Sequence, residues 1–284
     1  MKHKLLVFAA FVASLLLSGG ISLARDFSQI VASGELRIAI AAENLLPWIG
    51  RGENGELLGF EVDIGTKLAE DLGVEPKFVQ RPFDDLIPSL TADEVDIIVS
   101  GLSITAERAR RVMFSNPYGQ SDLEMVVSLP DMPEGAAEQS YDMKGIRIAV
   151  IEHTTSEFEG RERFQEAEVV PFADRNAARD AFLAGEVNAI IATKPYPAFI
   201  QLHDPDNYAI AGDPIASTVE AMAVHPDNYR LLNYANSWIY DAMASGFLEE
   251  ATHYWFETID WIDRVPGLSE YLETLTNEQT GGNR

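Results

Sequence analysis

Three polar residues, Ser103, Thr105 and Arg108, follow directly after an apolar run, Val95 to Val99, that predicts a buried strand. We expect the chain to pass there from a strand end into a helix start, with Ser103 or Thr105 as the cap. The free N–H groups and positive dipole end of such a helix bind anions, and Arg108 can add a bidentate fork for a carboxylate. The spacing therefore predicts a carboxylate site.

Thr154 and Thr155 stand at a second predicted helix start, after the apolar run Ile146 to Ile151. Two such starts on opposite sides of a cleft could hold one carboxylate between them. A lone S-x-T-x-x-R pattern more often means only a helix cap and an arginine paired with surface acids. The carboxylate site therefore depends on the elements that surround the pattern.

Short apolar strands alternate with amphipathic helices in two successive βαβαβ series, which predicts an α/β fold of two lobes. Two further strands, 124–128 and 218–224, would cross between the lobes as a hinge. The first lobe is expected to comprise 25–127 and 215–284, and the second 128–214, with the ligand in the cleft. The two series are expected at 36–41, 60–72, 77–79, 84–90 and 95–99, and at 146–151, 156–165, 168–170, 174–183 and 188–192.

The amino terminus has the pattern of a secretory signal peptide. Lys2 and Lys4 precede an apolar run from Leu5 to Leu17, and small residues lead up to Ala24. We expect cleavage after Ala24, which removes residues 1–24 and leaves a protein in the periplasm. The apolar run is shorter than the roughly 20 residues that span a bilayer.

Composition excludes several classes of protein. The chain has no Cys, so it has neither disulfides nor the cysteine that is acylated in a lipoprotein. The formal net charge of −24 at pH 7 disfavours nucleic acid as a partner. The length suits two domains of ordinary size, and we expect a soluble monomer.

The stretch from Ser100 to Arg108, S-G-L-S-I-T-A-E-R, resembles the S-G-[ML]-[ST]-I-T-x-x-R signature of the family 3 bacterial extracellular solute-binding proteins. These proteins are the polar amino-acid receptors of ABC importers. The resemblance implies a type II two-lobed periplasmic binding fold, a small carboxylate or amino-acid-like ligand, and the membrane subunits of an ABC importer as partners. Similar segments follow in the family's order at 34–39, 59–63, 114–118, 142–155, 246–248 and 255–256.

The resemblance also implies roles for individual residues. In the family, the residues that match Ser103 and Arg108 bind the α-carboxylate of the ligand, and the one that matches Gly101 contributes a backbone group. Trp48 resembles the family's position that packs on the ligand, and Phe83 is a weaker aromatic candidate. Each of these two aromatic residues could instead belong to the ordinary core.

Thr193 departs from the family pattern. It occupies the last position of a stretch that resembles G-x-V-D-A-x-x-x-D, in which the final Asp pairs with the ammonium of the ligand. Three outcomes stay open: an amine held against an aromatic face such as Trp48, an acidic ligand whose second anionic group meets Lys194, or an amino acid whose ammonium is bound by another acid such as Glu43. His153, which stands where the family usually has Gly, is expected at the rim.

An enzyme is one alternative, because some relatives of this fold are dehydratases. No G-x-S-x-G, H-E-x-x-H or P-loop sequence occurs, and the His residues are too scattered for a metal cluster. We therefore expect no catalytic residues, no metal and no cofactor. A lyase would have to use cleft carboxylates such as Glu43 or Glu152. A ligand-sensing subunit of a signalling receptor is the other alternative.

Overall fold

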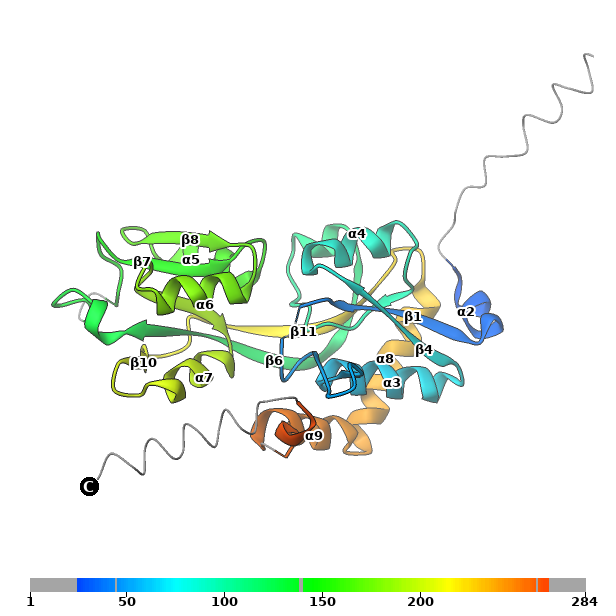
Figure 1. Cartoon of the computed structure of the whole chain (residues 1–284). Helices are drawn as coiled ribbons and strands as arrows, with labels where there is room; N and C mark the ends of the chain where they lie inside the picture. The colour runs from blue at the N-terminus through cyan, green and yellow to red at the C-terminus, as the bar shows by residue number, and fades with distance from the viewer. Residues whose placement is uncertain (1–24, 44, 138–139, 259, 266–284) are drawn as a thin grey trace, which may run out of the picture.

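The computed structural model describes residues 25–43, 45–137, 140–258 and 260–265, and the expected signal peptide lies outside them. One mixed sheet runs through the molecule in the order β4-β1-β5-β11-β6-β9-β7-β8, with β10 beside β6. Figure 1 shows two halves joined by two long strands, β6 (Met113–Ser128) and β11 (Ala216–Val224). The predicted α/β fold with two crossing strands is confirmed.

In the first half, β1 (Glu35–Ala41) lies between β4 (Glu75–Arg81) and β5 (Ile97–Ile98), and the three strands are parallel. The main helix, α3 (Phe60–Leu72), follows Gly59. A Cβ at Gly59 would lie 2.3 Å from the carbonyl oxygen of Trp48, so only glycine allows this close approach. The remaining elements of this half are α2 (Phe27–Ser33), β2 (Gly50–Arg51), β3 (Leu57–Leu58), α4 (Leu86–Thr91), α8 (Tyr229–Ala244), α9 (Phe247–Thr252) and the π-helical turn η4 (His253–Glu257).

In the second half, β7 (Arg147–Ile151) lies between β8 (Glu168–Phe172) and β9 (Ala189–Thr193), again in parallel. Asp174 caps the helix between β8 and β9, because its carboxylate accepts a hydrogen bond from the backbone N–H of Ala177 at 2.9 Å. This half is completed by α5 (Thr155–Arg163), α6 (Arg175–Leu183), α7 (Tyr196–His203) and β10 (Tyr208–Ile210).

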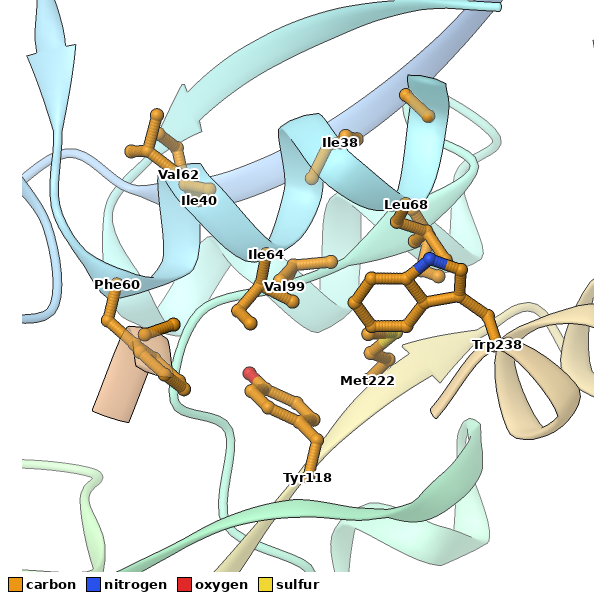
Figure 2. Packing of buried hydrophobic residues seen from close by; sticks show 14 of the residues in the cluster. Ile38, Ile40, Phe60, Val62, Ile64, Leu68, Val99, Tyr118, Met222 and Trp238 are labelled. Atoms are coloured by element: carbon orange, nitrogen blue, oxygen red, sulfur yellow. The ribbon is translucent and has the colours of Figure 1, made fainter. Parts of the chain in front are cut away.

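Separate apolar cores stabilise the two halves. The largest cluster of the first half joins β1, α3 and α8, and Figure 2 shows Ile64, Leu68, Met222 and Trp238 gathered in it, with Tyr118 at its edge. Residues 123–216 supply the two clusters of the second half. Because each half buries its own apolar side chains, the strands between them can bend without opening either core.

The change from one core to the other falls between Tyr118 and Leu123 on β6. Over this segment β6 pairs with β11 in antiparallel register, from Gly119 opposite Glu220 to Leu123 opposite Ala216. β6 continues into the second half, where Leu123 also pairs with Thr193 of β9. The lobe boundaries predicted at 127/128 and 214/215 stay a prediction.

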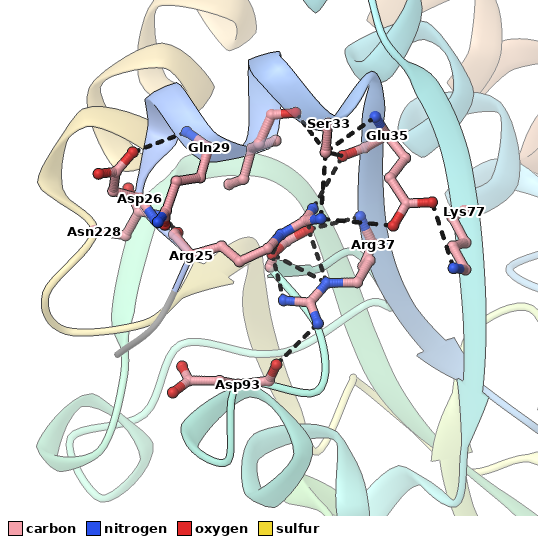
Figure 3. A network of polar contacts seen from close by, with 11 residues as sticks. Arg25, Asp26, Gln29, Ser33, Glu35, Arg37, Lys77, Asp93 and Asn228 are labelled. Carbon is pink, nitrogen blue, oxygen red and sulfur yellow. Dashed lines mark hydrogen bonds and ion pairs between the residues drawn. The ribbon is translucent and has the colours of Figure 1, made fainter. Parts of the chain in front are cut away.

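A network of charged residues fixes the start of the described chain (Figure 3). The carboxylate of Asp96, 1% exposed, forms ion pairs with Arg25 and Arg37, and it also accepts the backbone N–H of Arg37 at 2.8 Å. Arg25 reaches the carbonyl oxygen of Glu35 as well, at 3.0 Å. Asp96 immediately precedes β5, so this network anchors the strand that leads to Ser103.

Candidate functional site

A cavity of about 210 Å³ lies between the two halves. The first half contributes the loop after β1, the turn at Phe83 and the segment after β5, and the second half contributes the starts of α5, α6 and α7. The structure brings together at its wall every residue that the sequence predicted for the site: Glu43, Trp48, Phe83, Gly101, Ser103, Arg108, Thr154, Thr155 and Thr193. Their roles toward a ligand stay predictions.

Arg108 is held in place by its own loop. Its guanidinium donates to the carbonyl oxygen of Ser103 at 3.0 Å and lies 5.5 Å from the ring centroid of Phe83. Burial lowers the pKa of Arg108, which Glu107 and Asp84 partly offset, but an arginine stays charged at neutral pH. The guanidinium is therefore a fixed positive charge at the cavity wall.

The helix start predicted after Ser103 is wrong. Thr105 does accept the backbone N–H of Arg108 at 3.1 Å, but the turn it caps is η2 (Arg108–Arg110), a single 3-10 turn. The backbone of Ser103 instead forms a bridge with Glu220, and the N–H of Ile104 donates to Val219 at 2.9 Å. The chain thus pairs with β11 at Ser103 and Ile104, and only a short turn follows, so Arg108 supplies the positive charge in this half without the dipole of a longer helix.

The second helix start is present in the structure. α5 begins at Thr155, with Thr154 as its N-cap in extended conformation. The hydroxyl of Thr154 donates to the carbonyl oxygen of Ile151 at 2.7 Å and contacts the hydroxyl of Ser156 at 2.8 Å. These bonds fix the loop so that the N-terminus of α5 faces the cavity, where backbone N–H groups favour an anion.

Aromatic rings form the apolar part of the wall. Trp48 packs against Phe256 at 4.5 Å and Phe60 at 5.8 Å between ring centroids, so the indole is fixed by the core behind it. Its ring also lies 3.5 Å from where a Cβ on Gly101 would be. That distance is an ordinary van der Waals contact, and it is the left-handed backbone of Gly101, with φ of 59°, that favours glycine there. Trp48 belongs both to the core and to the cavity wall.

Lys194 and His153 stand away from the cavity wall. Lys194 is 58% exposed and pairs with Glu124 at 3.7 Å, so it does not offer its ammonium to an anionic ligand here. His153 adopts a left-handed backbone with φ of 60°, which accounts for glycine at the matching family position. Its exposed ring lies 3.9 Å from the carboxylate of Asp84 in the other half, which places it at the rim as expected.

The cavity wall also contains residues that the sequence did not single out. Arg175, at the first position of α6, lies 4.4 Å from the ring centroid of Tyr196, and burial lowers its pKa to about 10. Asp174 beside it was expected only as part of a helix. Glu220 of β11 was expected only as part of a strand. None of these positions carries a motif, so no sequence signal pointed to them.

Two buried acids, Glu61 and Glu220, lie next to the loop that carries Gly101. Tyr118 donates its hydroxyl to Glu61 Oε2 at 2.6 Å. Burial, with a smaller contribution from the nearby Glu220, raises the pKa of Glu61 to about 8 despite this hydrogen bond. Burial likewise raises the pKa of Glu220 to about 7, against a hydrogen bond from Ser121. Both carboxyl groups thus favour the protonated form.

Glu61→Gln should make the protein more stable at high pH. A carboxyl whose pKa is raised on folding stabilises the fold below its unfolded value of 4.5, and this contribution is lost as the pH rises toward about 8. We expect the variant to exceed the native protein in free energy of unfolding by at least about 1 kcal/mol at pH 8.5 and to match it at pH 5. Denaturant unfolding at both pH values measures this.

The matched control is Glu70→Gln, an exposed position on the same helix. This variant should show the same difference in free energy of unfolding between pH 5 and pH 8.5 as the native protein. If the difference in free energy of unfolding between Glu61→Gln and the native protein were the same at both pH values, a protonated Glu61 would be contradicted.

Within the described parts of the chain, no group of three or more His, Cys, Asp and Glu side chains is arranged to hold a metal ion. Over the same residues, no helix has the length and apolar character needed to cross a membrane.

Comparison with known proteins places this chain among solute-binding proteins. A model of the bacterial extracellular solute-binding proteins, family 3, matches residues 36–258. The chain is 26% identical over 210 residues to the L-cystine-binding protein TcyJ of Escherichia coli (strain K12), covering 74% of this chain and 78% of TcyJ. It is 29% identical over 222 residues to ABC transporter arginine-binding protein 1 of the same strain, covering 74% and 86%.

An enzyme is also among the similar proteins. The chain is 24% identical over 237 residues to cyclohexadienyl dehydratase of Pseudomonas aeruginosa, covering 81% of this chain and 85% of that enzyme.

Among solved structures, a mutant of ArgBP from T. maritima superposes with a TM-score of 0.71 at 29% identity, covering 81% of this chain and 99% of that one. An ancestral arginine-binding protein bound to arginine gives 0.70 at 27%, covering 78% and 98%.

Proposed function

Because the chain belongs to the bacterial extracellular solute-binding proteins of family 3, we propose that it binds an amino acid between its two halves and delivers it to an ABC importer. The predicted type II fold is confirmed by the matching structures. The observation that carries the proposal is the cavity itself, in which Ser103 and Arg108 of one half face Thr154 and Thr155 of the other. A ligand that contacts both sides would stabilise the closed arrangement.

We assign the α-carboxylate of the ligand to Ser103 and Arg108 in the first half and to the N-terminus of α5 in the second. Arg108 offers N–H donors beyond the one bonded to Ser103. The backbone N–H groups at the start of α5 would complete the anion site from the second half. The indole of Trp48 supplies an apolar surface for the carbon skeleton.

The charges of the cavity wall favour a ligand with a positive group in addition to its carboxylate. The wall has two arginines, Arg108 and Arg175, and five acids, of which four remain as negative charges when Glu220 is protonated. One oxygen of Glu43 is buried without a hydrogen-bond partner, and a ligand cation would satisfy it. The acids of the wall are Glu43, Asp84, Glu152, Asp174 and Glu220. Basic amino acids, which some of the similar proteins bind by name, are therefore the first candidates.

We further propose that the two halves are the lobes of the binding protein, with a hinge where β6 and β11 cross. The expected cleavage after Ala24 would make Arg25 the first residue of the exported protein. Arg25 is tied to Asp96 and Glu35, which fits a folded domain that begins at that residue. The membrane subunits of an importer would then meet the closed form of both lobes.

A lyase is the rival function, because a dehydratase is among the similar proteins. One cavity acid, Glu220, has a pKa raised to about 7, as a general acid would need. Mass spectrometry of candidate amino acids and of cyclohexadienyl substrates after incubation with the protein separates the two functions. Solutes recovered unchanged support the binding protein, and turnover to a dehydrated product contradicts it.

Thermal-shift screening of amino acids, betaines and organic acids tests the proposal directly. A ligand that binds only the folded protein stabilises it by mass action and so raises the apparent melting temperature. At a ligand concentration of one hundred times the dissociation constant, the gain in stability is about 2.7 kcal/mol. At least one amino acid should raise the melting temperature. If none does while an unrelated organic acid does, the proposed amino-acid function is wrong.

A further inference from the structure

We propose that Glu220 binds the α-ammonium group of the amino acid, in place of the acid that Thr193 lacks. This inference rests on the proposed function, because it names the partner of a second group on the same ligand.

Glu220 lies beside the carboxylate site. The backbone of Glu220 forms an antiparallel bridge with Ser103, and both residues belong to the cavity wall. In an α-amino acid, a single carbon atom separates the ammonium from the carboxylate. The acceptor of the ammonium must therefore adjoin the residues that bind the carboxylate, and Glu220 is the acid that pairs with Ser103.

The carboxyl group of Glu220 is built into the floor of the site. The residue is 2% exposed, and its Oε2 has no hydrogen-bond partner among the described residues. Ser121 donates its hydroxyl to the same carboxyl group. A Cβ on Gly119 would lie 2.8 Å from Oε2, so the absence of a side chain at 119 makes room for the carboxyl against β6. A buried carboxyl with an unsatisfied oxygen is costly unless a ligand donor completes it.

The register of the sheet relates Glu220 to Thr193. β6 lies between β11 and β9, with Gly119 opposite Glu220 and Leu123 opposite Thr193. Side chains alternate along a strand, so residues that pair with positions 119 and 123 project from the same face. Ser121, which hydrogen-bonds to Glu220, lies midway between these two positions on β6. Glu220 on β11 can thus bind the ligand ammonium that an acid at position 193 on β9 would bind.

The buried titratable groups around Glu220 explain why the site favours a positively charged ligand group. Glu61 of α3 and Tyr118 of β6 lie near Glu220, and burial of both carboxyl groups disfavours two negative charges there. An ammonium in the cavity would favour ionisation of Glu220 and pair with it. A charge-assisted bond of this kind contributes more than a neutral one. A ligand without the amino group would leave the carboxyl protonated and unsatisfied.

The test compares ligands that differ only in the α-amino group, measured by isothermal titration calorimetry. The probe pairs are arginine with 5-guanidinopentanoic acid, lysine with 6-aminohexanoic acid, and glutamine with 4-carbamoylbutanoic acid. In the Glu220→Gln variant, whose folding is checked by circular dichroism, we expect affinity for the amino acid to fall by at least about tenfold. Affinity for the deaminated partner should change by less than about threefold.

A second variant tests rescue. Adding Thr193→Asp to Glu220→Gln supplies an acid from β9, and we expect it to restore the preference for the amino acid over its deaminated partner. Equal losses for both members of a pair, or a selective loss in Glu43→Gln but not in Glu220→Gln, would overturn the inference and leave the proposed function standing. Failure of the native protein to bind any of the common amino acids would overturn both.

Discussion

Arg108→Ala is expected to weaken binding of arginine by at least about tenfold while the protein still folds. Arg108 is the only arginine that the loop after β5 directs to the cavity wall, where Phe83 and the carbonyl oxygen of Ser103 fix it. Its removal leaves the ligand carboxylate with Ser103 and the N-terminus of α5, without a positive side chain. Affinity should therefore decrease for every ligand that has a carboxylate, with or without an amino group.

Isothermal titration calorimetry measures the loss, and circular dichroism checks the fold. Arg110→Ala is the matched control, since Arg110 belongs to the same 3-10 turn but is exposed and lies outside the cavity wall. The control should bind arginine within about twofold of the native protein. Near-native affinity in a folded Arg108→Ala variant would remove Arg108 from the carboxylate site.

Asp96→Ala is expected to reduce the free energy of unfolding by about 3 to 5 kcal/mol, because it leaves two arginines without their buried partner. The carboxylate of Asp96 is 1% exposed and pairs with Arg25 and Arg37. Arg37 lies on β1, and Asp96 directly precedes β5, so the loss would also loosen the strand that carries the Ser103 loop. Urea unfolding followed by circular dichroism gives the free energy.

The control for Asp96 is Glu94→Ala. Glu94 pairs with Arg81 at 2.9 Å, but the two side chains are 51% and 34% exposed, and ion pairs at the surface contribute about 0 to 1 kcal/mol. The contrast between the two variants separates the buried network from ordinary surface charge. Equal, small effects from both substitutions would show that the network of Figure 3 does not anchor the fold.

The fold follows closely from local patterns in the sequence. The helix predicted at 60–72 is α3 (Phe60–Leu72), because its apolar positions recur at helical spacing and Gly59 and Gly73 bound it. The strand predicted at 95–99 is shorter, since only Ile97 and Ile98 find partners in the sheet. Helix α7 (Tyr196–His203) was missed, because it begins directly after a proline that follows a strand.

The cavity wall was predicted only in part. The residues that the sequence did not predict come to the wall through pairing between segments that are far apart in the chain. The motif at Ser103 to Arg108 predicted residues that lie at the cavity wall, but it predicted a helix where the structure has a single 3-10 turn after the residues that pair with β11. Glu220 stands in an alternating strand sequence, where an acid is ordinarily exposed. Only the packing of β6 and the Ser103 loop around it buries its carboxyl. Such burial depends on segments about one hundred residues apart, which local sequence patterns do not relate.

Titration of the exported, ligand-free protein with the common amino acids by isothermal titration calorimetry tests the central claim most directly. The proposed function predicts that at least one amino acid binds with a dissociation constant in the micromolar range or below, about −8 kcal/mol or stronger. One molecule should bind per chain, because one cavity joins the two halves. The absence of binding heat for every amino acid, from protein that circular dichroism shows to be folded, would contradict it.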